Sequence, residues 1–77
     1  MLIYLKTMTI KKTHEHLKHM WARVELGEQK YKSLLEQGNA IEMVCKNSIN
    51  MPEIYMDVDI YAKFKSDKQR MWFELTY

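Results

Sequence analysis

The sequence predicts a small α+β domain with one long amphipathic helix packed on a three- to four-stranded antiparallel sheet, in the order (β)-α-β-β-β. Two observations predict this fold. Apolar residues recur at helical spacing between residues 13 and 37, and apolar and polar residues alternate from Ile54 to Phe64. A chain of 77 residues builds a single hydrophobic core, so residues 1–77 are expected to form one domain.

The first half of the chain predicts a strand and then the helix. Residues 2–10 are rich in β-branched and aromatic types, which favour an opening strand. Thr13 is a suitable N-cap for the helix, and Gly38 supplies the left-handed residue that ends it. Gly27 interrupts the helical pattern and lowers helix stability by roughly 1 kcal/mol relative to alanine. The sequence leaves open one kinked helix or two shorter helices at 13–26 and 28–37.

The second half predicts the rest of the sheet. Apolar residues alternate with polar ones over residues 41–45, 54–64 and 71–77, which favours three strands. The turn at Ser66–Gln69 is expected to pair 71–77 with 54–64, which sets Lys63 opposite Trp72. The segment 41–45 is expected to pair antiparallel on the other side. Residues 54–64 therefore become the central strand, with one face buried and one face exposed.

The residue types disfavour catalysis and metal binding. Neither of the two glycines lies in a phosphate-binding loop, and Cys45 alternates with the core positions, where a thiol behaves as an inert hydrophobe. His14, His16 and His19 do not share one face of a helix, so they do not close a tetrahedral metal site. We therefore expect a protein that is not an enzyme and that needs no cofactor.

The leading functional hypothesis is a small regulator or inhibitor that binds another protein. Aromatic and acidic residues are expected to share the outer face of the sheet, where tyrosine and tryptophan supply a large contact area at low entropic cost. The expected partner-binding residues are Tyr55, Tyr61, Trp72, Asp57, Asp59 and Glu74. A homodimer through this face is compatible with the same pattern.

Nucleic-acid binding is the alternative hypothesis. Five basic residues fall at steps of four, three, four and seven, and one continuous helix would align them along one flank: Lys12, His16, His19, Arg23 and Lys30. The formal net charge of +2 is too small to favour this reading by itself.

Composition also bears on location. The single cysteine cannot form a disulfide within the chain, which is typical of a reducing compartment. The apolar opening Met1–Leu5 is too short for a signal sequence or a membrane span. The sequence therefore predicts a soluble cytoplasmic protein that does not bind membranes.

Overall fold

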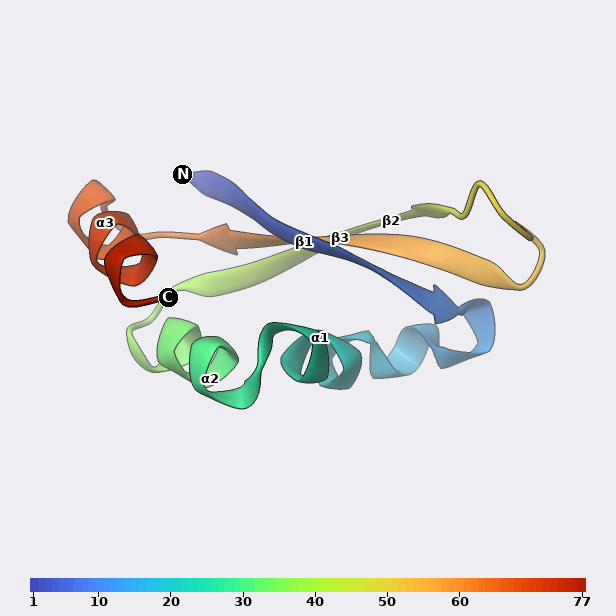
Figure 1. Cartoon of the computed structure of the whole chain (residues 1–77), viewed down its shortest axis with the longest axis horizontal. Helices are drawn as coiled ribbons and strands as arrows, with labels where there is room; N and C mark the ends of the chain where they lie inside the picture. The colour runs from blue at the N-terminus through green and yellow to red at the C-terminus, as the bar shows by residue number, and fades with distance from the viewer.

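The computed structural model describes all 77 residues as a three-stranded sheet with helices on one side and at one end (Figure 1). The elements follow the order β1 (Leu2–Lys11), the 3₁₀ helix η1 (Lys12–Leu17), α1 (Lys18–Leu26), α2 (Glu28–Glu36), β2 (Ala40–Asn47), β3 (Tyr55–Lys63) and α3 (Asp67–Thr76). The molecule is elongated, with principal extents of 41 × 19 × 17 Å.

The sheet has the strand order β1-β3-β2, and both strand pairs are antiparallel. β3 is central, as expected, but its neighbour opposite β2 is β1 and not the segment 71–77. Its even-numbered residues from Met56 to Ala62 are buried, and the odd-numbered ones lie on the opposite face. The β2–β3 register is regular along its whole length, whereas β1 contains a bulge between Tyr4 and Lys6.

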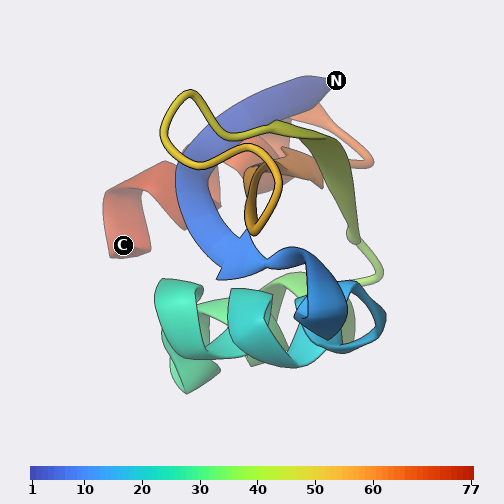
Figure 2. The ribbon, with the colours of Figure 1, turned by 90° about the vertical axis from the view of Figure 1, so that its right-hand side faces the viewer.

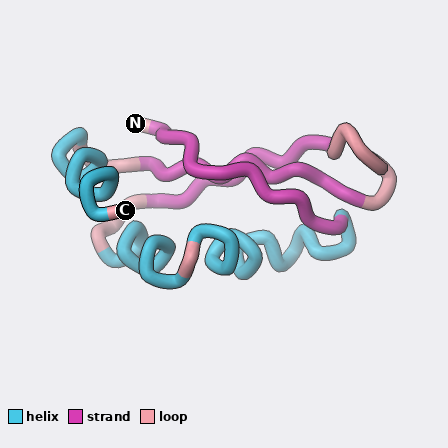
Figure 3. The backbone as a smooth tube through the Cα atoms, viewed as in Figure 1, coloured by secondary structure: helices cyan, strands magenta, loops and turns pink.

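Two adjoining clusters of buried residues form the core between the sheet and the helices. The first joins Ala22 of α1 to apolar residues of β1 and β3, and its largest fully buried side chains are Val58 and Ile60. The second lies where β3 ends and joins Leu34 of α2 to Phe73 of α3. All helices therefore pack on one face of the sheet or at its end, and the other face has no covering layer (Figure 3).

The prediction of one long helix is wrong. The helical layer is interrupted at Gly27, which has φ +92° and ψ 140° and lies outside the helical region. The chain instead forms two shorter helices, α1 and α2, and the first turns before α1 are 3₁₀ helix. Thr13 does not cap this layer, because η1 already begins at Lys12 without a side-chain cap.

The predicted strand at 71–77 is also wrong, because α3 spans Asp67–Thr76. Ser66 acts as its N-cap, since the Ser66 hydroxyl accepts a hydrogen bond of 3.2 Å from the Gln69 N–H. Arg70 then pairs with Asp67 and Glu74, each at 2.8 Å, on one side of the helix. The segment expected to be a β-turn is in fact a helix start, and the sheet has no hairpin there.

Candidate functional site

The uncovered face of the sheet is the surface with the most distinctive chemistry. β3 is its centre and presents Tyr55, Asp57, Asp59 and Tyr61, four of the six residues predicted to bind a partner. The flanking strands add side chains at the paired positions, namely Tyr4, Thr7 and Thr9 from β1 and Glu42, Val44 and Lys46 from β2. We call these ten residues the open face.

Trp72 and Glu74 do not belong to the open face. Both lie on α3, because the segment that was expected to be the neighbouring strand is helical. Trp72 is 45% exposed and does not lie opposite Lys63, whose partners in the sheet are Leu2 and Ala40. Glu74 is held by Arg70 at 2.8 Å instead of facing Tyr61. The predicted six-residue site is therefore divided between two surfaces.

Tyr4 and Tyr61 form the aromatic part of the open face. They are cross-strand neighbours, and their rings meet edge to face with centroids 5.8 Å apart. The Tyr4 hydroxyl shares a hydrogen bond of 2.7 Å with the Thr7 hydroxyl across the bulge. Tyr4 remains 54% exposed, so this aromatic pair is accessible at the surface.

The acidic residues of the open face are already paired within it. Asp57 accepts a hydrogen bond of 2.7 Å from Thr9, and Asp59 accepts one from Thr7. Lys46 Nζ lies 3.2 Å from the second carboxylate oxygen of Asp59. Since each threonine lies directly opposite its aspartate in the β1–β3 register, strand pairing positions these contacts. The carboxylates therefore organise the face more than they offer free charge to a partner.

These contacts shift the pKa values of two groups. The hydrogen bond from Thr7, followed by the contact with Lys46, holds the pKa of Asp59 below its ordinary value of 3.8. The hydrogen bond and charge of Asp59 raise the pKa of Lys46 above its ordinary value of 10.5. The stabilisation from Asp59 is therefore fully present above pH 3.8 and is lost as the pH falls through its lower folded-state pKa.

Replacing Thr7 by valine is expected to raise the pKa of Asp59 toward its ordinary value, because Thr7 makes the largest contribution to the shift. The variant should also lose part of the pH dependence of its unfolding free energy at acidic pH. NMR titration of the Asp59 carboxylate measures the first effect, and urea unfolding at several pH values measures the second. Thr9→Val is the matched comparison, because it removes the equivalent hydrogen bond to Asp57, and an equal rise of the Asp59 pKa in that variant would contradict the role of Thr7.

The basic residues of the alternative hypothesis lie in the helical layer. Lys12 and His16 are on η1, His19 and Arg23 are on α1, and Lys30 is on α2. The break at Gly27 and the 3₁₀ geometry of η1 mean that they do not form one row along a single helix. Lys30 lies over the Phe73 ring, with Nζ 5.6 Å from the ring centroid, so it is engaged by α3.

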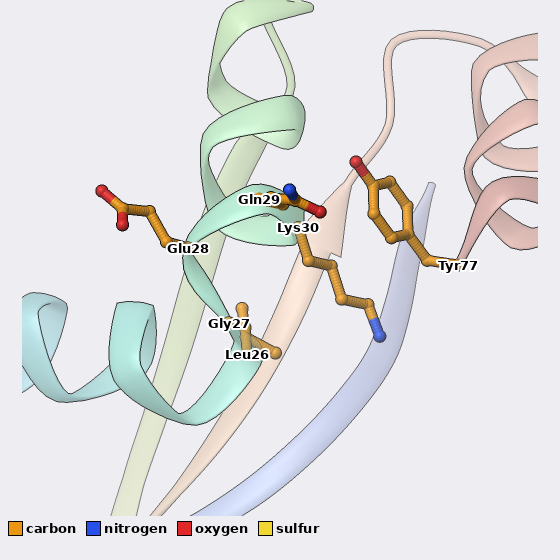
Figure 4. Close-up of a pocket in the computed structure, with 6 residues that line it drawn as sticks. All are labelled: Leu26, Gly27, Glu28, Gln29, Lys30 and Tyr77. Carbon is orange, nitrogen blue, oxygen red and sulfur yellow. The ribbon is translucent and has the colours of Figure 1, made fainter.

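The hollows in the surface are open to solvent. One of about 370 Å³ lies at the α1–α2 break, where Lys30 and Tyr77 flank it while Glu28 points away (Figure 4). No group of three or more histidine, cysteine, aspartate or glutamate side chains gathers closely enough to hold a metal ion. Cys45 is a free, half-buried thiol on β2, on the helical side of the sheet.

No helix has both the length and the apolar composition needed to cross a membrane. No protein-family model, curated protein or solved structure matches the chain. The functional assignment therefore depends on the surfaces of this molecule alone.

Proposed function

We propose that this chain is a small, non-enzymatic cytoplasmic protein that regulates another protein by binding it through the open face. The observation that carries the proposal is the bare side of the sheet, on which the exposed Tyr4 packs against the half-buried Tyr61. Tyrosine, tryptophan and arginine are the residue types most enriched at the energetic centre of protein interfaces.

The charge pattern of the open face supports a partner with little net charge where it makes contact. Lys46, Asp57 and Asp59 are tied to neighbours within the face, and Glu42 lies 3.9 Å from Lys63. A partner would therefore displace few strong charges and would pack on tyrosine rings and on Val44, which is 54% exposed. We expect such binding to depend only weakly on salt, because the contacts are mainly apolar.

Tyr61→Ala and Tyr4→Ala are each expected to weaken partner binding by about thirtyfold, as truncation of a central aromatic residue does in other interfaces. Trp72→Ala is the matched control, since this exposed aromatic residue lies on α3, away from the open face. The measurement is capture of partners from cytoplasmic extract by the immobilised chain and each variant, with and without nuclease and at two salt concentrations.

A protein that is lost from both tyrosine variants, kept by Trp72→Ala and unaffected by nuclease supports the proposal. Equal loss from Trp72→Ala would show that the open face is not the binding surface. Binding that nuclease or moderate salt abolishes would instead favour the nucleic-acid hypothesis, in which exposed Lys12, His16, His19 and Arg23 contact phosphates.

A further inference from the structure

The outer edge of β2 is unpaired and uncovered. β2 contacts β3 on one side and α2 below, and no helix or strand lies on its outer side (Figure 2). Edge strands are normally protected from pairing with other chains by bulges, prolines or charged side chains. β2 contains no proline and pairs with β3 in a regular register over eight residues, so its free edge is straight enough to accept another strand.

The other edge of the sheet is protected. β1 is bulged between Tyr4 and Lys6, which bends the strand and interrupts its ladder. Lys6 also forms an ion pair of 2.9 Å with Glu25 of α1 beside this bulge. The two edges therefore differ, and strand addition is favoured only at β2.

The hydrogen bonds of β3 show which groups of β2 are free. Just beyond the two ends of β3, the Phe64 N–H donates to the Met1 carbonyl and the Ile54 carbonyl accepts from the Lys12 N–H. Backbone groups of successive residues in a strand point to alternate sides, so all even-numbered residues of β3 direct theirs toward β1. The odd-numbered residues then pair with Ala40, Glu42, Val44 and Lys46 of β2. The free N–H and C=O groups on the outer edge therefore belong to Ile41, Met43, Cys45 and Asn47.

We propose that two copies of this chain associate through their β2 edges, antiparallel, with Val44 on the two-fold axis. This register pairs Met43 with Cys45 of the second copy and Ile41 with Asn47, which brings the free backbone groups of both strands into hydrogen-bonding positions. The symmetry axis is perpendicular to the sheet, so a continuous six-stranded sheet results, with both open faces on one side.

Charge complementarity selects this register over its neighbours. With Val44 on the axis, Glu42 lies directly opposite Lys46 of the second copy, twice in the dimer. If the axis passes through Met43 or Cys45 instead, Glu42 and Lys46 each lie opposite an uncharged residue of the second copy. If it passes through Glu42 or Lys46, that residue lies opposite its own copy, so two like charges face each other.

The same register extends ion pairs that each chain already makes. Glu42 lies 3.9 Å from Lys63, and Lys46 lies 3.2 Å from Asp59. In the dimer the charges alternate across the junction in the order Lys63, Glu42, Lys46 of the second copy and Asp59 of the second copy. Both Glu42 and Lys46 are about half exposed in the single chain, so each has room for a second partner.

Sedimentation equilibrium over micromolar to millimolar concentrations is expected to show a monomer–dimer equilibrium for the parent chain. Glu42→Lys alone and Lys46→Glu alone should each dimerise about tenfold more weakly, because like charges then lie opposite each other twice. An equimolar mixture of the two variants should recover association, since the heterodimer restores opposite charges at both positions. Circular dichroism of each variant checks that the fold is kept.

Cysteine cross-linking tests the axis directly, in a Cys45→Ala background. Val44→Cys should form a covalent dimer under mild oxidation, because the two Cα atoms lie about 4.5 Å apart in a non-hydrogen-bonded antiparallel pair. Glu42→Cys and Lys46→Cys should each remain uncross-linked alone and should cross-link when mixed. A parent chain that stays monomeric throughout, higher oligomers without a dimer, or no cross-link at position 44 would each overturn the proposal.

Discussion

Phe73→Ala is expected to destabilise the protein by about 3–5 kcal/mol, whereas Leu75→Ala on the same helix should change stability by less than about 0.5 kcal/mol. Phe73 is 5% exposed and packs with Phe64, with ring centroids 5.4 Å apart, while Leu75 is 86% exposed. A chain of this length has a total stability of about 4–12 kcal/mol, so the loss at Phe73 should be large enough to release α3.

Urea unfolding followed by circular dichroism measures both free energies. Phe73→Leu is a milder second variant that keeps the comparison informative if Phe73→Ala does not fold. Comparing Phe73→Ala with Leu75→Ala also distinguishes a helix from a strand, because a strand over 71–77 would place Phe73 and Leu75 on the same buried face. Equal destabilisation by the two alanine variants would contradict the helical assignment of α3.

Ile60→Ala is expected to lower the free energy of unfolding by about 2–5 kcal/mol, because it leaves a cavity at the centre of the sheet. Ile60 is fully buried on β3 between the two flanking strands and the helical layer. Ile60→Val should cost about 0.5–1.5 kcal/mol and provides a measurable value if the larger truncation prevents folding.

Val44→Ala is the matched control for Ile60→Ala. Val44 also lies in the sheet, but it is 54% exposed on the open face, so its truncation should cost less than about 1 kcal/mol. Both free energies are measured by chemical denaturation at a chain concentration low enough to keep the protein monomeric. A cost at Val44 equal to that at Ile60 would show that the open face is covered in the free protein.

The sequence was sufficient to predict the sheet where alternation continued over many residues. Nine successive residues of β3 alternate between buried and outward positions as expected, because a register slip would bury Asp57 and Asp59. The strands at 2–10 and 41–45 were also predicted close to their observed bounds. In each case burial on one face is the physical cause of both the pattern and the fold.

The errors arose where two periodicities fit the same residues. Met71, Phe73, Leu75 and Tyr77 alternate, yet Phe73 and Tyr77 are also four residues apart, and their tilted rings pack with centroids 5.1 Å apart at the end of α3. The sequence signal that favours a helix here is Ser66 followed three residues later by Gln69, a pattern that begins many helices. Trp72 and Glu74 lie on α3 and not on a strand of the sheet, so the same error explains why the six predicted binding residues do not share one surface.

The residues of β1 on the open face were harder to predict. Thr7 and Thr9 face Asp59 and Asp57 only because the bulge after Tyr4 shifts the register by one residue. A bulge of this kind leaves no reliable mark in the sequence when no glycine is present. The hydrogen bonds that organise the open face therefore became visible only with the strand pairing.

The break at Gly27 also has a mechanical consequence for the helical layer. β-sheets twist, so a single straight rod of 25 residues, about 37 Å long, would follow the sheet at one end and diverge from it at the other. The break at Gly27 lets α1 pack against β1 and α2 pack against β2. A substitution that straightened the chain there would force one of the two helices to lift off its part of the core.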